Sequence, residues 1–202
     1  MLTTGCAYRS TFDSNYYCEK LDLTCINKNQ RVVFKTSKGN IHVQLYGKNK
    51  PVTVSNFIQN VKKNIYKNKR FYKIFNFPQV QLIHSGIFPE NNYYNKENQT
   101  LNKFRGKIPL EIKYKKEFEP KYGYQILNPS EIVSLTNFFE KGSLAMVKSG
   151  ERSSSSTEFF FVTNKFPELD GRYSIFGKVV KGIETLKKID KEDLIYEIII
   201  SN

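Results

Sequence analysis

Hydrophobic and polar residues alternate clearly around a turn in the first third of the chain. The run RVVFKTSKGNIHVQLY, residues 31–46, contains a turn signal at Ser37–Asn40 between two strand-like stretches. In the second stretch every other residue is apolar, from Ile41 to Leu45, so one side is buried and the other faces solvent. His42 falls on the solvent side. This pattern predicts a β-hairpin.

The segment that follows has the period of an amphipathic helix. After Pro51, the apolar residues Val54, Phe57, Ile58 and Val61 are spaced i, i+3, i+4 and i+7. This spacing places them on one stripe of a helix. We therefore predict a helix that plugs an opening in a sheet.

Most of the remaining pattern consists of short strands. Strand-like runs are KRFYKIF, QVQLIHSG, KIPLEIKY (residues 107–114), SLAMV, EFFFVT, YSIFGKVV and IYEIII. Pro129–Glu131 predicts the start of a helix capped by Ser130, and GIETLKKI predicts a short helix. Many antiparallel strands, two longer helices and no βαβ rhythm predict a mainly β fold, a closed barrel with helical plugs. Residues 1–30 show no sustained period and are interpreted as an N-terminal extension.

Composition and charge narrow the classes of protein that this chain can belong to. With 202 residues, 39% hydrophobic and 25% charged, it is suited to one globular domain. No apolar run approaches the ~20 residues that span a bilayer, so we expect the body of the protein to be soluble. The net charge is +13, and the strongest basic run lies at residues 60–73. Because lysines are spread along the whole chain without a groove-entering motif, we favour a solvated basic surface over a nucleic-acid partner.

Three cysteines, Cys6, Cys18 and Cys25, lie near the beginning of the chain. The spacing of Cys18 and Cys25 is poor for zinc and suits a small disulfide loop in an oxidising compartment, which leaves Cys6 over. The residues LTTGC resemble a bacterial lipobox, although a signal peptide would need an apolar segment upstream. Two alternatives stay open. If Cys6 is acylated, a lipid anchor holds the protein in the cell envelope or periplasm; otherwise the segment is a loose tail of a cytoplasmic protein.

Five sequence blocks occur in one order along the chain: KGNIHVQLYGKNKPVTVSNFI, IYKNKRFYKI, GSLAMVKSG, SSSSTEFFFVT and LDGRYSIFGKVVKGIETLKKI. Together they resemble the cyclophilin-type peptidyl-prolyl isomerases over about residues 31–200. RGKIPLEIK and the residues around it are most similar to cyanobacterial members. The resemblance implies a domain at 31–202, with a long insertion at about 87–141. It also implies a closed eight-stranded antiparallel barrel capped by two α-helices.

The same resemblance implies an activity: the chain accelerates rotation about X–Pro bonds in proline-containing segments of unfolded proteins, as a monomer without cofactor or metal. Amide resonance sets a barrier of ~18–20 kcal/mol for this rotation. At the twisted transition state the prolyl nitrogen becomes a hydrogen-bond acceptor, so a donor aimed at it is catalytic. The family uses an arginine in a Phe-His-Arg block, and here the matching residue is Lys73. Lysine keeps the charge but lacks the planar fork, and it could also be an ordinary exposed strand lysine.

A second family residue, a glutamine before two glycines, binds the substrate carbonyl. Two alignments compete for it in this chain, Gln81 and His84, and we prefer His84 because Ser85 and Gly86 follow it. A neutral imidazole can donate a hydrogen bond as an amide does. Protonation of the imidazole would make the site sensitive to pH.

The proline ring should be held by an apolar pocket, for which the resemblance implies Met146, Phe160, Leu169 and Tyr173. Strand alternation places Phe160 on the face opposite to its two neighbouring phenylalanines. The remaining substrate-binding positions depart from the family pattern. They are Glu158 for a glutamine, Glu168 for an aromatic residue, Val147 for a small residue and Lys148 for an asparagine. These departures leave a second function open: a catalytically weak module that binds proline segments as a chaperone or scaffold.

Overall fold

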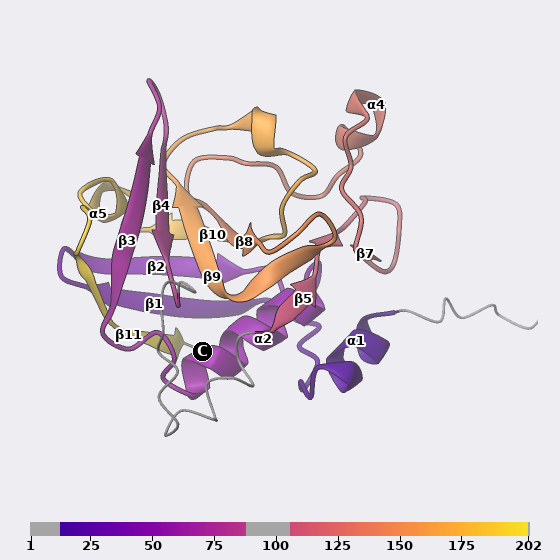
Figure 1. Ribbon diagram of the computed structural model, residues 1–202, viewed down its shortest axis with the longest axis horizontal. Helices are drawn as coiled ribbons and strands as arrows, with labels where there is room; N and C mark the ends of the chain where they lie inside the picture. Colours follow the sequence, from indigo (N-terminus) through magenta and orange to yellow (C-terminus); the bar gives the residue numbers. More distant parts are fainter. Residues whose placement is uncertain (1–12, 88–105, 202) are drawn as a thin grey trace, which may run out of the picture.

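The structure is a computed structural model that describes residues 13–87 and 106–201 (Figure 1). No helix in these ranges is long and apolar enough to cross a membrane. In chain order the elements are α1 (Ser14–Lys20), β1 (Gln30–Thr36), β2 (Gly39–Leu45), α2 (Pro51–Lys62), β3 (Lys69–Asn76), β4 (Gln81–Ser85), β5 (Lys107–Pro109), β6 (Glu111–Ile112), β7 (Lys121–Tyr122), α4 (Pro129–Ile132), β8 (Ser143–Lys148), β9 (Ser153–Val162), the 3₁₀ turn η2 (Pro167–Leu169), β10 (Ile175–Lys181), α5 (Ile183–Lys187) and β11 (Leu194–Ser201).

Eight of the strands form a closed antiparallel barrel in the order β4-β3-β11-β1-β2-β10-β8-β9. The barrel closes because β4 also pairs with the C-terminal half of β9, from Phe159 to Val162. The N-terminal half of the same long strand pairs with β5 instead. The predicted closed eight-stranded barrel is therefore confirmed.

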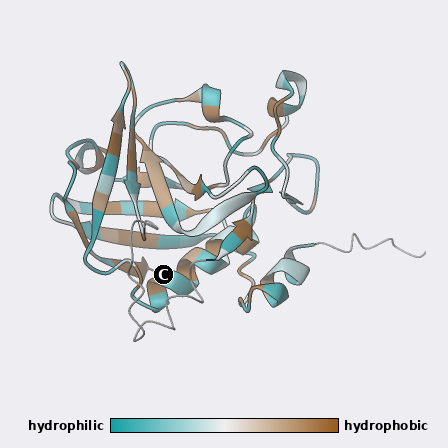
Figure 2. Cartoon of the chain, in the orientation of Figure 1, coloured by the Kyte–Doolittle hydropathy of each residue, from teal (hydrophilic) through white to brown (hydrophobic). Residues whose placement is uncertain are grey.

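The barrel interior is filled by large aromatic and aliphatic side chains. The ring of Phe34 on β1 lies 5.3–6.1 Å from the rings of Phe57, Phe159 and Phe161, measured between centroids. Phe57, which enters from α2, also lies 5.8 Å from Phe159. The predicted hairpin and helix are both confirmed, since β1 pairs with β2 and the stripe that includes Phe57 is buried. Figure 2 shows the alternation of hydrophobic and hydrophilic residues along β1 and β2.

The N-terminal segment, which shows no sustained period in the sequence, contains a short helix in the structure. Helix α1 begins after Asp13, whose side chain accepts a hydrogen bond from the Tyr16 N–H. Cys18 forms a disulfide with Cys25, and the Cys18 side chain packs with Val52 at the start of α2. From residue 13 onward the segment is thus attached to the helix that plugs the barrel. Cys6, with its predicted lipidation, lies outside the described residues and stays a prediction, as does the predicted domain division.

Two predictions for the insertion need correction. The single strand expected at residues 107–114 is divided into β5 and β6, which pair with different partners. Ser130 does not cap α4: Asn128 does, and its side chain accepts from the Ser130 N–H. The reason is local, because Pro129 suits the first helical position and the cap is the residue before it.

A carboxylate from β6 holds the first turn of α2. Glu111, fully buried in β6, accepts hydrogen bonds from the backbone N–H groups of Val52 (3.2 Å) and Thr53 (2.8 Å). It also accepts from the Tyr122 hydroxyl on β7 at 3.1 Å. The first N–H groups of a helix have no partner within the helix, and its N-terminus favours negative charge. Glu111 therefore joins β6 and β7 to the helix that plugs the barrel.

We expect Glu111→Ala to lower the free energy of unfolding by roughly 3 kcal/mol or more, because it leaves several buried donors without an acceptor. Glu111→Gln, which keeps one acceptor oxygen, should cost less. Urea unfolding followed by circular dichroism measures both, with the exposed Glu151→Ala as the matched control. An Ala variant within ~0.5 kcal/mol of wild type would show that this carboxylate does not hold α2.

Candidate active site on the outer face of the barrel

Three predicted site residues form one row across three neighbouring strands. Lys73 on β3 is paired with His84 on β4, and His84 is paired with Phe160 on β9. Paired residues of adjacent antiparallel strands point to the same side of the sheet. This side is the outside of the barrel, because the neighbouring Ile83 and Phe161 belong to the interior core. The structure therefore brings Lys73, His84 and Phe160 together on one face.

A β-bulge adjusts the position of the lysine. The register of β3 with β4 shifts between Phe71 and Lys73, so that Tyr72 is an extra residue in the ladder. Phe71 is buried inside the barrel, whereas the Tyr72 ring lies outside, 6.3 Å from the His84 ring. The bulge thus gives the outer face two consecutive β3 side chains, Tyr72 and Lys73.

The Phe160 ring lies in an aromatic cluster of its own. The His84 imidazole stacks on it at 5.1 Å and 15° between planes, and the Phe139 ring stacks at 5.8 Å and 15°. The Tyr173 ring meets it edge to face at 5.3 Å. Leu169 and Val147 pack against the same cluster. Phe160 itself is only 1% exposed, so in this structure its ring is covered by other side chains.

Met146 does not belong to this face. On β8 it is paired with Phe159, whereas its neighbour Ala145 is paired with Phe160. Met146 is fully buried among the interior residues of the barrel and cannot reach a ligand on the outside. The predicted role of Met146 in the pocket is therefore wrong, and the small side chain of Ala145 takes that place.

Of the two candidates for the carbonyl-binding position, the structure places His84 beside Phe160. Gln81 lies three residues earlier on β4, and its side chain donates to the Asn76 carboxamide at 2.9 Å. The Nε2 atom of His84 is buried and has no hydrogen-bond partner among the described residues. Burial, and secondarily the charge of Lys73, lowers the pKa of His84 to about 4. The imidazole is thus neutral near pH 7, and the pH sensitivity expected from the sequence moves to acidic conditions.

The lysine is held by a neighbouring ring. The Lys73 Nζ lies 4.5 Å from the centroid of the Phe75 ring, an arrangement that attracts a cation to an aromatic face. Phe75 is 38% exposed, and its ring is 5.3 Å from the His84 ring. The ammonium therefore lies beside the His84–Phe160 stack and close to solvent.

The polar rim contains the remaining predicted positions. The Tyr72 hydroxyl donates to Glu158 Oε1 at 2.7 Å. Burial raises the pKa of Glu158, and hydrogen bonds from Tyr72 and Ser155 oppose the increase. Lys148 Nζ lies 5.9 Å from the centre of the Tyr173 ring, and Glu168 lies in the exposed turn η2.

Sequence reasoning assigned no role to three aromatic residues of this face: Tyr72, Phe75 and Phe139. Strand parity could have placed Phe75 on the side of Lys73. Nothing in the local pattern around Phe139 indicates that its ring packs on Phe160, since the two residues are distant in sequence.

The chain matches the family model "Cyclophilin type peptidyl-prolyl cis-trans isomerase/CLD" over residues 31–199. It belongs to the cyclophilin family. Because the matched range includes nearly all residues of the barrel strands and the row from Lys73 to Phe160, the site described above is the outer face of a cyclophilin domain.

Several proteins named as peptidyl-prolyl cis-trans isomerases are similar in sequence. A "peptidyl-prolyl cis-trans isomerase-like 2" of Cryptococcus neoformans is 29% identical over 189 residues, which cover 91% of this chain and 28% of that protein. A peptidyl-prolyl cis-trans isomerase of Helicobacter pylori is 25% identical over 182 residues, 87% of this chain and 89% of that protein. A Synechocystis protein named for the same activity is 29% identical over 174 residues, 81% of this chain and 45% of that protein. The chain thus spans about a quarter of the first relative and somewhat less than half of the third.

Crystal structures of a Cryptosporidium parvum cyclophilin-type isomerase share the fold. One has a TM-score of 0.57 and 22% identity, and covers 87% of this chain and 99% of that one. A second, determined in the presence of the dipeptide Ala-Pro, has a TM-score of 0.56 and 23% identity, and covers 86% and 99% of the two chains.

We expect the stability of the protein to fall as His84 is protonated. Its folded pKa, about 4, lies below the ordinary value of ~6.5, so the unfolded chain binds this proton more readily. The contribution of the neutral imidazole to the free energy of unfolding is complete above pH ~6.5. It is lost as the pH falls toward 4, which lowers the free energy of unfolding by about 2–3 kcal/mol. Urea unfolding between pH 7 and pH 4 measures it as the difference between wild type and His84→Gln.

The chain has one other histidine, His42, and His42→Gln is the matched control. It should keep the wild-type dependence of stability on pH. If wild type and His84→Gln lose stability in parallel over this range, the imidazole is not held neutral by its surroundings.

Proposed function

We propose that this cyclophilin is a peptidyl-prolyl cis-trans isomerase acting on proline-containing segments of proteins. One observation carries the proposal: a cation, an imidazole and a phenylalanine lie in a single row, Lys73–His84–Phe160, across three strands of the outer face. The names of the relatives support the same activity.

In this proposal the aromatic cluster binds the pyrrolidine ring. Phe160, Leu169 and Tyr173 supply apolar surface, which also removes water from the amide and so disfavours its planar, charge-separated form. The presence of an Ala-Pro dipeptide with the C. parvum protein supports a proline-containing ligand.

Lys73 is the donor to the prolyl nitrogen. That nitrogen accepts a hydrogen bond only when the peptide bond is twisted, so the contact favours the transition state over the ground state. Each ~1.4 kcal/mol of such preference gives a tenfold increase in rate. The cation–π contact with Phe75 limits the positions of the ammonium, which partly replaces the rigidity that an arginine fork would provide.

His84 orients the substrate in the same scheme. Its imidazole is neutral near pH 7 and can donate one hydrogen bond to the carbonyl next to the proline, and its buried Nε2 has no partner among the described residues. Glu158, held by Tyr72, offers an acceptor to a substrate N–H at the rim. Val147 and Lys148 border the adjoining subsite.

Turnover should be lower than in family members that have an arginine at the position of Lys73. Lysine holds its donor more loosely. In addition, Phe160 is 1% exposed, so a proline ring reaches it only after the His84 or Tyr173 side chain moves. The same two features favour a second candidate function, a module that binds proline segments without accelerating their rotation.

We expect Lys73→Ala to reduce kcat/KM at least about tenfold, and Lys73→Arg to increase it, because the first removes the donor and the second fixes it. Exchange spectroscopy by NMR on an Ala-Pro peptide measures the rate directly. Lys69→Ala, on the same strand, is the control for loss of a positive charge.

The binding module makes a different prediction for the same variants. If Lys73→Arg accelerates rotation while Lys73→Ala behaves as wild type, the natural protein is a binder. If the folded wild-type protein produces no rate above background, the proposed isomerase activity is wrong.

A further inference from the structure

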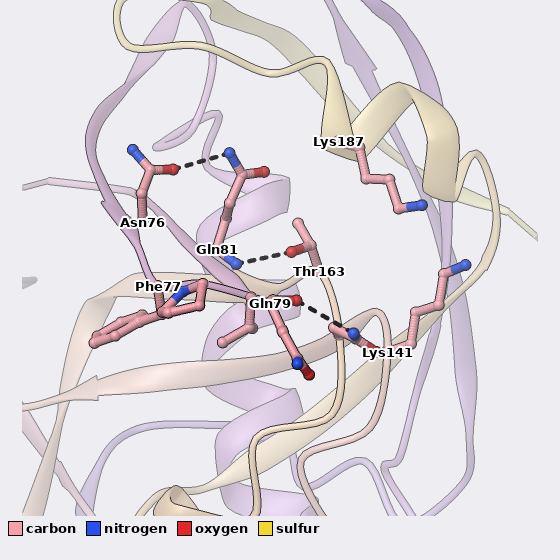
Figure 3. A pocket seen from close by; sticks show the side chains of 10 residues that line it. Asn76, Phe77, Gln79, Gln81, Lys141, Thr163 and Lys187 are labelled. Carbon is pink, nitrogen blue, oxygen red and sulfur yellow. Dashed lines mark hydrogen bonds between the residues drawn. The ribbon is translucent and has the colours of Figure 1, made fainter.

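A cavity of about 440 Å³ lies at one end of the barrel, outside the row of site residues. It is bordered by the β3–β4 turn from Asn76 to Gln81, by Thr163 and Asn164, which follow β9, and by Lys141 and Lys187. Figure 3 shows the two lysines on one side of the cavity and the carboxamides of Asn76 and Gln81 on the other. Apart from Gln81, which one alignment with the family places at the carbonyl-binding position, neither the family resemblance nor the proposed mechanism uses these residues.

The lining of this cavity is polar and positively charged. Among the described residues that border it, the two lysines are the ionisable ones, and none is a carboxylate. The nearest counter-ion is Glu184 on α5, at 3.2 Å from Lys187 Nζ and 4.0 Å from Lys141 Nζ. The Glu184 side chain is 69% exposed, and such exposed ion pairs are weak, so another carboxylate can compete for the lysines.

Hydrogen bonds fix the opposite wall. Gln81 Nε2 donates to Asn76 Oδ1 at 2.9 Å, which leaves the Gln81 carboxamide oxygen on the side of the lysines (Figure 3). The Gln81 backbone N–H donates to Thr163 Oγ1 at 2.8 Å, and Asn164 Nδ2 donates to the Gln79 carbonyl at 3.2 Å. The cavity thus presents a fixed acceptor opposite two cations. A peptide segment with a main-chain N–H and a nearby side-chain carboxylate matches both walls.

The cavity adjoins the aromatic cluster of the active site. Val80 lines the cavity and also packs in the cluster that contains Phe160. On β4, Gln81 is three residues from His84, and Thr163, the first residue after β9, is three residues from Phe160. Three strand residues span about 10 Å, which is also the length of three residues of an extended peptide.

The geometry points to a second subsite, in which Lys141 and Lys187 bind an acidic side chain about three residues from the proline of a substrate. This inference rests on the proposed isomerase function for its link to the proline. Binding of the acidic segment itself depends only on the cavity. The enzyme is therefore selective for prolines in acidic sequences.

Two pairs of peptides test this selectivity. In each pair an Ala-Pro peptide carries Glu or Gln at one position, three residues before the proline in one pair and three residues after it in the other. NMR exchange gives kcat/KM for each peptide, and titration of the side-chain amide signals of Gln81 gives its Kd. For at least one pair we expect the Glu peptide to be favoured about threefold to fivefold in both quantities. The preference should shrink at 0.5 M NaCl, a test concentration at which the screening length is about 4 Å.

Variants assign the preference to the cavity. The double substitution Lys141→Gln and Lys187→Gln should remove it and leave turnover of the Gln peptides unchanged. Glu184→Gln should increase it, because it removes the competing carboxylate. Lys188→Gln, which changes the next residue and does not line the cavity, should leave it intact.

Three results would overturn the inference. The first is that neither pair shows a preference for the Glu peptide, and the second is that the preference survives the double substitution. The third is that Lys188→Gln reduces the preference as much as the double substitution does, which would reflect net charge alone. Failure of the isomerase proposal looks different. In that case no peptide is isomerised, while the Kd ratio of the Glu and Gln peptides still decides whether the cavity binds a carboxylate.

Discussion

The hydrogen-bonded pairing of β4 with β9 is the constraint on which both the fold and the site depend. It closes the sheet into a barrel, and it also determines which side chains meet on each face. In the observed register Ile83 and Phe161 point inward, while His84 and Phe160 point outward and stack. A slip of one residue would exchange the two faces, so the register that completes the core is the register that assembles the site.

The side chains around Phe160 on the outer face of the barrel form a second, smaller hydrophobic core. His84, Phe139 and Tyr173 surround Phe160 so completely that the ring has almost no contact with solvent. This packing stabilises the position of each ring. If the form that accepts a proline is only a fraction of the population, the apparent affinity for a ligand falls by that fraction. Tighter packing of the cluster therefore lowers the fraction of molecules in which a proline ring can reach Phe160.

Much of the architecture could be read from the sequence, because periods of two and of 3.6 residues directly report which positions are buried. Those periods located the first hairpin and α2, and the ordered motifs indicated the barrel. Register between distant strands leaves no such local signal. For that reason the inward position of Met146, the bulge at Tyr72 and the stacking of Phe139 on Phe160 could not be predicted. The cap by Asn128 could have been found, since the residue before a helical proline is the usual cap.

The contact between Glu111 and the first turn of α2 has a consequence for the evolution of the domain. An insertion that only decorates a surface can be lost or shortened with little effect, because loop length alone costs little. Here residues 107–122 supply the acceptor for a helix inside the structural core, and Tyr122 shares that acceptor. A descendant that deletes these residues must therefore acquire a new cap for α2 in the same step, which makes this segment difficult to lose.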